Sequence, residues 1–160
     1  MSIAVGDRIP EVELRTLGDA GPQKVSSTDV LGKGKVVLFA VPGAFTPGCS
    51  KVHLPGFVSR ANELTAKGVD TVACIAINDA WVMDAWAKSP GADDKILMLA
   101  DGNGEFTEAM GLVFDGGVVG LGSRSQRYAA IIEDSVITQL DVEEKPGIDV
   151  SSCENVLTKL

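Results

Sequence analysis

Residues 36–50 read VVLFAVPGAFTPGCS and contain an apolar run, a loop rich in proline and glycine, and a cysteine. The run Val36–Val41 is continuous and rich in β-branched residues, which predicts a strand covered on both faces. Apolar residues at helical spacing follow from about Pro47 to Lys67, with a kink expected near Leu54 because Pro55 lies inside the helix. The stretch therefore predicts a junction between a central strand and a helix, which is where open α/β sheets bind ligands.

The rest of the chain predicts strands and helices on both sides of this junction. Glu11–Val25 is typical of a hairpin that turns at GDAGP. The elements expected further along are a strand at Val69–Ile77, a helix capped by Asn78 or Asp79 and stopped by Ser89-Pro90-Gly91, a strand at Ile96–Ala100, a brief helix within 101–112, a glycine-rich loop at 114–122, a hairpin of Arg127–Glu133 and Val136–Val142 turning at Asp134-Ser135, and a helix at Ser151–Leu160 opened by a capping box of Ser151 and Glu154.

This order of elements predicts an α/β protein. Strands that alternate with helices before a late hairpin are typical of a thioredoxin-like fold, with a central mixed β-sheet flanked by helices and an N-terminal β-hairpin. The sequence shows no repeat and no linker, so we expect residues 1–160 to form a single domain.

Composition excludes several classes of function. Apolar residues make up 45% of the 160 residues and charged residues 22%, as in ordinary globular proteins. The net charge of −8 disfavours binding to nucleic acid or to an anionic membrane surface. The first 15 residues are charged where a signal peptide is apolar, and three cysteines, an odd number, fit a reducing compartment. We therefore expect a cytoplasmic protein whose thiols matter as chemistry.

Cys49 is the candidate nucleophile. Thr46 is a good helix N-cap and Pro47 suits the first helical position, so Cys49 falls in the first turn. Unpaired N–H groups and the helix dipole stabilise a thiolate there, which is the attacking form. Thr46 stands where the C-x-x-C motif of a dithiol reductase has its first cysteine, and a lone thiolate beside a hydroxyl suits oxidation to a sulfenic acid. The alternatives are that Cys49 is a small core residue and Thr46 only a cap.

The run PGAFTPGCS, followed by KVHLPGF at 51–57, closely resembles the peroxiredoxins and, within them, the type II or peroxiredoxin-5-like branch. Matches at 75–86, 101–112 and 122–128 extend the resemblance over nearly the whole chain. It implies a thiol-dependent peroxidase, without metal, haem, flavin or other cofactor, that reduces hydrogen peroxide and alkyl hydroperoxides in antioxidant defence. The sulfenic acid would be reduced again by glutathione, glutaredoxin or thioredoxin.

The resemblance also implies roles for individual residues. Cys49 matches the peroxidatic cysteine, and Thr46 matches the hydroxyl residue that positions the peroxide and the sulfur. Pro42 matches the proline that shields the thiolate from solvent. Arg127 matches the arginine that holds the peroxide oxygens, and it is preferred to Arg124 because an aromatic residue follows it, as in the family. The alternative for either arginine is a solvated surface charge.

For the residues around Cys49, the sequence leaves more than one role open. His53 lies four residues after Cys49, on the same helical face, and is either a structural part of the site wall or a base beside the thiol. No pair of close cysteines would complete a zinc site with Cys49 and His53. The resemblance implies a homodimer with its contact near the site, for which Phe45 and Gly116–Gly122 are candidates; the alternative for both is ordinary loop packing.

The two remaining cysteines have open roles. By pattern Cys74 is a core residue of a buried strand, whereas plant-like type II members carry a resolving cysteine at a similar place. A disulfide between Cys74 and Cys49 would require local unfolding of the helix that carries Cys49. Cys153 begins the last helix, where we expect a lowered pKa. It is either a resolving cysteine, such as the one animal peroxiredoxin-5-like proteins carry opposite Val150, or a spare or glutathionylated thiol.

Two rival functions use the same cysteine. One is a glutathione-dependent transferase or oxidoreductase in which Cys49 forms a mixed disulfide. The other is a non-catalytic redox-sensing or holdase-like protein in which oxidation of Cys49 is only a signal. Sustained turnover of peroxide separates the peroxidase from both.

Overall fold

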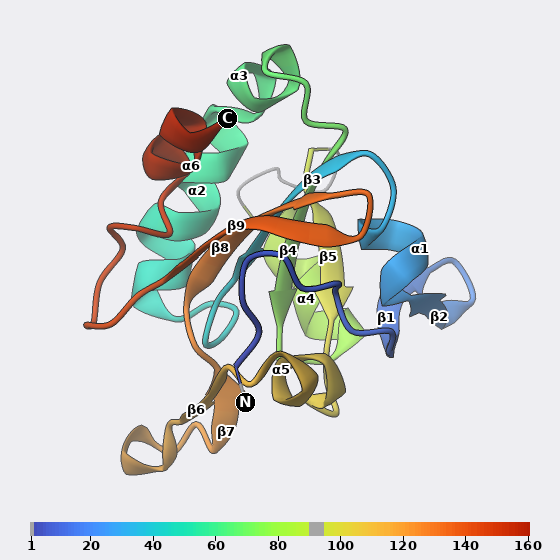
Figure 1. Cartoon of the computed structure of the whole chain (residues 1–160). Coiled ribbons are helices and arrows are strands. Elements are labelled where there is room, and N and C mark those ends of the chain that lie inside the picture. Colours follow the sequence, from blue (N-terminus) through green and yellow to red (C-terminus); the bar gives the residue numbers. More distant parts are fainter. Residues whose placement is uncertain (1, 90–94) are drawn as a thin grey trace.

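The computed structural model describes residues 2–89 and 95–160, and within them the main sheet has seven strands in the order β2-β1-β5-β4-β3-β8-β9 (Figure 1). Strands β3, β4 and β5 run parallel, and the other neighbours pair antiparallel. This confirms the thioredoxin-like mixed sheet with its N-terminal hairpin. The strands are β1 Glu13–Gly18, β2 Gly21–Ser26, β3 Lys35–Ala40, β4 Thr71–Ala76, β5 Leu97–Ala100, β8 Tyr128–Glu133 and β9 Val136–Val142.

Helices cover both faces of this sheet (Figure 1). They are α1 Ser27–Leu31, α2 Leu54–Ser59, α3 Ala61–Ala66, α4 Ala80–Lys88, α5 Glu105–Met110 and α6 Cys153–Lys159. Side chains of β3 alternate between the faces: Val37 and Phe39 pack with α2, α3, α4 and α6, whereas Val36 and Leu38 pack with α1 and α5. Two covered faces explain why the strand is continuously apolar. None of the described helices has the length and apolar character needed to cross a membrane.

The helical segment that carries Cys49 is irregular. It begins at Pro47 as expected, passes through a π-helical stretch, Cys49–His53 (η1), and continues as α2 from Leu54. Pro55 has no N–H to donate to an α-helical ladder, and the change of helix type at Leu54 confirms the expected irregularity. A further break, not expected from the sequence, lies at Arg60 between α2 and α3.

The glycine-rich stretch 114–122 is not the loop that we predicted. It belongs to a small hairpin of β6 (Val113–Asp115), a 3₁₀ turn η2 (Gly117–Val119) and β7 (Ser123–Ser125). The N–H of Gly116 donates to the carbonyl of Gly122 at 2.7 Å and closes the hairpin. Strands of three residues are too short to show a clear alternation of apolar and polar residues, so the sequence pattern concealed them.

The observed ends of the helices decide between the alternatives that the sequence left open. The N-cap of α4 is Asp79, whose carboxylate accepts from the N–H of Val82 at 2.8 Å. This helix ends at Lys88, and the expected stop at Pro90-Gly91 lies outside the described residues. The short helix α1 was not expected.

The predicted capping box at the last helix is wrong. The N-cap of α6 is Ser152, whose hydroxyl accepts from the N–H of Asn155 at 3.2 Å. Ser151 is instead turned toward β9, where its hydroxyl donates to the carboxylate of Glu143 at 2.6 Å. Both serines precede a helical pattern, so only the tertiary contact of Ser151 distinguishes them.

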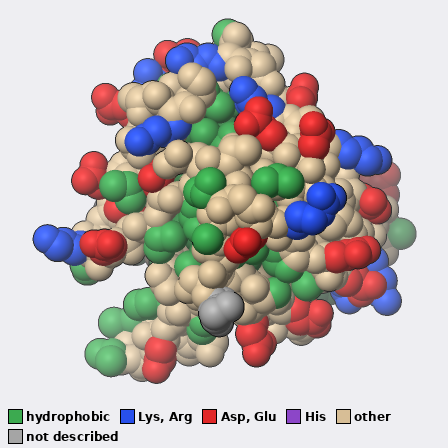
Figure 2. All heavy atoms as spheres, in the orientation of Figure 1, with side chains coloured by type: hydrophobic (Ala, Val, Ile, Leu, Met, Phe, Trp, Pro, Cys, Tyr) green, Lys and Arg blue, Asp and Glu red, His purple; other side chains and the backbone are tan. Residues whose placement is uncertain are grey.

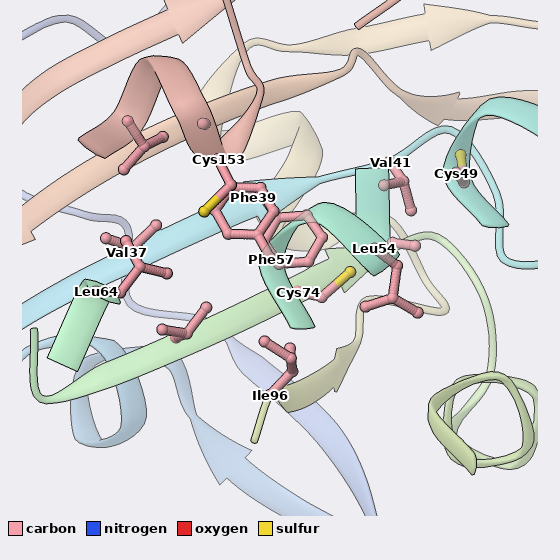
Figure 3. Close-up of a cluster of buried hydrophobic side chains, with 14 of the residues drawn as sticks. Val37, Phe39, Val41, Cys49, Leu54, Phe57, Leu64, Cys74, Ile96 and Cys153 are labelled. Carbon is pink, nitrogen blue, oxygen red and sulfur yellow. The ribbon is translucent and has the colours of Figure 1, made fainter. Parts of the chain in front are cut away.

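An aromatic stack fixes the Cys49 helix on the sheet. The rings of Phe39 in β3 and Phe57 in α2 lie parallel, with centroids 4.0 Å apart (Figure 3). The imidazole of His53 packs beside both rings, at 5.0 Å and 5.6 Å. Because all three side chains are buried, this packing sets the position of the π-helical turn relative to the ends of the strands.

We therefore predict that Phe57→Ala lowers the free energy of unfolding by about 3–5 kcal/mol, because it leaves a cavity beside Phe39. Urea unfolding at one fixed protein concentration measures the change. The matched control is Trp81→Ala, at a side chain 61% exposed, for which we expect a change of about 0.5 kcal/mol or less. Equal effects of the two substitutions would contradict this account of the core.

Candidate active site

The loop before Cys49 is held by the carboxyl ends of two parallel strands. It follows β3, and the N–H of Ala44 donates to the side-chain oxygen of Asn78, just beyond β4, at 2.9 Å. Phe45 has a φ of 66°, in the left-handed region that a bulky residue rarely adopts, and its side chain is half exposed. Backbone strain at such a position is typical of functional loops. The site lies where the strand-to-helix pattern predicted it.

The sulfur of Cys49 is fully buried and contacts the hydroxyl of Thr46. Thr46 Oγ1 lies 2.9 Å from Cys49 Sγ and 2.7 Å from the carbonyl oxygen of Gly43. A hydroxyl has one proton and accepting lone pairs. With a thiol, S–H can donate to Oγ1 while the hydroxyl donates to Gly43; with a thiolate, the hydroxyl can turn to the sulfur. Thr46 therefore accommodates both states, and its hydroxyl bonds Gly43 and Cys49 instead of capping the helix as expected.

The guanidinium of Arg127 lies against the same sulfur. Its Nη2 donates to Cys49 Sγ at 3.1 Å, and its Nη1 donates to Nδ1 of His53 at 3.0 Å. Gly48 permits this approach, because a Cβ at that position would lie 3.3 Å from Nη2. A charge-assisted bond from a fixed fork of donors stabilises negative charge on the sulfur.

The structure separates the two candidate arginines. Arg124 donates to the carbonyls of Leu121 and Ile77, both at 2.9 Å, and so ties the β6–β7 hairpin to the end of β4. Of the two, only Arg127 makes a hydrogen bond to the sulfur. The sequence-based preference for Arg127 agrees with this geometry.

His53 is a neutral part of the site wall. Its Nε2 lies 2.9 Å from the carbonyl oxygen of Ser151 and its Nδ1 accepts from Arg127. A guanidinium has no acceptor and a carbonyl no donor, so the partners require a proton on Nε2 and a lone pair on Nδ1. Burial is the largest cause that lowers the pKa of His53 to about 4, and the nearby charge of Arg127 lowers it further. The geometry favours the structural alternative, because Nδ1 is already engaged with the guanidinium.

A cavity of about 530 Å³ adjoins this cluster, and both Pro42 and Arg127 line it. Its other walls are the β6–β7 hairpin and the segment after β9. Figure 2 shows the surface hollowed at this place, between the apolar tip of the hairpin and the charged loop above it. Pro42 therefore shares the wall of this open cavity with Arg127, and its role in shielding the thiolate from solvent stays a prediction. Among the described residues, no cluster of three or more His, Cys, Asp or Glu side chains could hold a metal.

The other two cysteines are free and buried in the same cluster of side chains (Figure 3). Cys74 is fully buried in β4, and burial raises its pKa well above the usual range. The expected lowering of the pKa of Cys153 is wrong: burial raises it to about 11, although Arg60 acts in the opposite direction. In Figure 3, Cys153 lies well apart from Cys49.

Sequence reasoning missed two groups of residues at the site. Ser151 contacts His53 from 98 positions away in the chain, and Glu143 in turn binds Ser151; no local pattern marks either residue. The indole N–H of Trp86 in α4 donates to the hydroxyl of Ser50 at 2.9 Å, a contact that the sequence pattern did not indicate. The one sequence feature that could have pointed to this contact is that Ser50 directly follows Cys49 in the chain.

We predict that His53 titrates near pH 4 and that its protonation destabilises the protein. The unfolded chain binds this proton near pH 6.5, so between these values the unfolded state holds more protons and stability falls as pH falls. The loss amounts to about 3 kcal/mol on going from pH 7 to pH 4.

His53 is the single histidine of the chain, so NMR of its ring measures the midpoint directly. Urea unfolding of the wild type and His53→Asn at both pH values measures the linkage, which the variant should lack. A midpoint near 6.5 would overturn the prediction.

Comparisons with known proteins agree with the fold. A family model described as Redoxin matches residues 4–157. Peroxiredoxin-2E, a chloroplastic protein of Arabidopsis thaliana, is 50% identical to this chain. The matched region takes in 99% of this chain and 70% of the relative. The structure of reduced Prx3 in complex with H₂O₂ from Vibrio vulnificus is 46% identical, with a TM-score of 0.93 over 98% of both chains.

A third relative confirms the branch. The structure of peroxiredoxin 5 from Alvinella pompejana is 36% identical, with a TM-score of 0.86 over 98% of this chain and 96% of that chain. Together with the PGAFTPGCS motif, whose threonine and cysteine meet an arginine in space, these relatives confirm the resemblance seen in the sequence. The chain belongs to the redoxin family and, within it, to the type II, peroxiredoxin-5-like peroxiredoxins.

Proposed function

We propose that Cys49 is the nucleophile with which this thiol peroxidase reduces hydrogen peroxide and small alkyl hydroperoxides. The observation that carries the proposal is the pair of hydrogen bonds to its sulfur, from Thr46 and Arg127. They stabilise a thiolate and leave donors beside it for an incoming oxygen. The relative from Vibrio vulnificus, whose structure contains H₂O₂, supports hydrogen peroxide as a substrate.

In the first step the thiolate attacks one oxygen of the hydroperoxide. The S–O bond forms as the O–O bond breaks, and the electron pair of that bond leaves on the second oxygen. Arg127 can follow this developing charge with its fork of donors, and a proton from solvent converts the leaving group to water or an alcohol. Cys49 is oxidised to the sulfenic acid and the peroxide is reduced by two electrons.

In the second step an external thiol restores Cys49. The thiolate of glutathione, glutaredoxin or thioredoxin attacks the sulfenic sulfur and forms a mixed disulfide; the S–O bond breaks, and a proton from solvent converts the leaving hydroxide to water. A second thiol then attacks the disulfide and frees Cys49. Because Cys49 is buried, an external thiol requires the turn that carries it to open. An internal disulfide would in addition require Cys74 or Cys153 to leave its core position, which supports an external thiol.

We predict that one equivalent of hydrogen peroxide oxidises Cys49 first, because no other cysteine has an arginine donor at its sulfur among the described contacts. Intact-mass analysis and peptide mapping of the reduced protein measure this. Cys49→Ser should lose peroxidase turnover about a thousandfold. Cys74→Ser and Cys153→Ser are matched controls that should retain turnover with glutathione and glutaredoxin.

Four results would contradict parts of the proposal. Equal oxidation of the three cysteines would reject Cys49 as the nucleophile. A disulfide from Cys49 to Cys74 or Cys153 would show an internal resolving cysteine. Oxidation of Cys49 without turnover under any thiol would favour the redox-sensing alternative, and mixed-disulfide transfer without peroxide reduction would favour the transferase.

We also propose that the protein forms a homodimer through the β6–β7 hairpin and Phe45. Figure 2 shows apolar side chains at the tip of this hairpin, where Val118 is fully exposed and Val119 is 71% exposed. Phe114 and Phe45 add further exposed apolar area near the site. Such a group of exposed apolar side chains is typical of an interaction surface.

Val119→Asp should therefore shift the protein from dimer to monomer, because it places a charge in the apolar contact. Sedimentation velocity at micromolar concentration measures the change. Trp81→Asp, at a similarly exposed apolar side chain on α4, is the matched control and should leave the mass in solution unchanged. A wild-type monomer would refute the proposal.

We propose a cytoplasmic location, supported by the odd number of cysteines, three, which fits a reducing compartment. The alternative is a plastid, since peroxiredoxin-2E of Arabidopsis thaliana is described as chloroplastic. Fractionation of the source cells with detection of the protein distinguishes the two.

A further inference from the structure

The hydrogen bonds around His53 form a closed ring that runs through Glu143. Arg127 donates from Nη1 to Nδ1 of His53, and the Nε2 of His53 lies against the carbonyl of Ser151. The N–H and hydroxyl of Ser151 both donate to Oε2 of Glu143, at 2.9 Å and 2.6 Å. The backbone N–H of Glu143 donates to the carbonyl of Arg127 at 2.9 Å, which returns the ring to its start.

Glu143 holds the turn before α6 with one carboxylate oxygen. Besides the two donors of Ser151, the N–H of Asp149 donates to Oε2 at 2.7 Å. Burial raises the pKa of Glu143, but the hydrogen bonds from Ser151, Asp149 and Val150 outweigh it and lower the pKa. The carboxylate is therefore the form that holds the turn, and it does so with charge-assisted bonds.

The turn determines which nitrogen of His53 carries the proton. With the carbonyl of Ser151 facing Nε2, that nitrogen must be the donor, and Nδ1 is left as the acceptor for Arg127. If the carbonyl turns away, the proton can move to Nδ1. An N–H at Nδ1 would face the N–H groups of Arg127, and the guanidinium would have to leave its position at Cys49.

We propose that Glu143 is a positioning residue of the peroxidase reaction: by holding Ser151 against His53 it fixes the imidazole tautomer that aims Arg127 at the sulfur of Cys49. The inference rests on the proposed function. It assigns a role to a carboxylate that does not contact the sulfur, and it gives His53 a function other than that of a base.

The test compares Glu143→Ala, Glu143→Gln and Glu108→Ala. We expect the second-order rate constant for oxidation of Cys49 by hydrogen peroxide to fall about tenfold in Glu143→Ala, because the guanidinium is displaced. Glu143→Gln keeps an acceptor oxygen and should give an intermediate rate. Glu108→Ala removes an exposed carboxylate on α5, away from the lining of the cavity, and should match the wild type. Stopped-flow fluorescence or competition with a reference peroxidase measures the rates.

The second measurement is the ring of the single histidine by long-range ¹H–¹⁵N NMR. The wild type should show only the tautomer with the proton on Nε2, and Glu143→Ala a mixture of both tautomers. A role of Glu143 in stability alone would lower the unfolding midpoint and leave the tautomer and the rate constant of the folded protein unchanged.

Two results would overturn the inference: an unchanged rate constant in Glu143→Ala, or a lowered rate constant while the ring keeps its proton on Nε2. Should Glu143→Ala fail to fold, Glu143→Gln decides by the same two measurements. Failure of the proposed function is distinguishable, because in that case Cys49 of the wild type does not react selectively with peroxide, whatever the state of His53.

Discussion

The contact between the guanidinium of Arg127 and the sulfur of Cys49 is the constraint on which the rest of the site depends. A fully buried sulfur can carry negative charge only if donors replace the water that it has lost. Thr46 supplies one donor and Arg127 a charged one. A partly buried guanidinium is held in place by acceptors, and the neutral imidazole of His53 provides one without adding a second positive charge. The fold therefore has to bring a loop, a helix and a strand end to one point.

Local backbone features make this meeting possible. The loop after β3 holds Phe45 in a strained conformation and presents the hydroxyl of Thr46 to the sulfur. Gly48 leaves room for Arg127 over the first helical turn. The π-helical turn carries both Cys49 and His53, and the stack of aromatic rings beneath it ties that turn to the sheet. Each feature serves the geometry of the sulfur and its donors.

Much of the fold followed from the sequence because its signals are local. The continuous apolar run of β3, the hairpin turn at Asp134-Ser135 with positive φ at both residues, and the cap at Asp79 all depend on neighbours in the chain. The predictions failed where the decisive partner is distant or the element is short. The β6–β7 hairpin has strands of only three residues. Ser151 binds Glu143 in a tertiary contact and therefore does not cap the last helix, as the sequence had predicted.

For the site, the sequence by itself determined the cysteine, the threonine three residues before it, and their place at the start of a helix, because spacing along one turn is a local property. It also singled out Arg127, through the resemblance to a family. Only the tertiary structure decided that His53 is neutral, that its proton lies on Nε2, and that Glu143 and Ser151 belong to the site. It also reversed the expected pKa shift of Cys153, since burial at that helix end raises the pKa. Protonation depends on desolvation and on partners brought from other elements, and neither can be read from the order of residues.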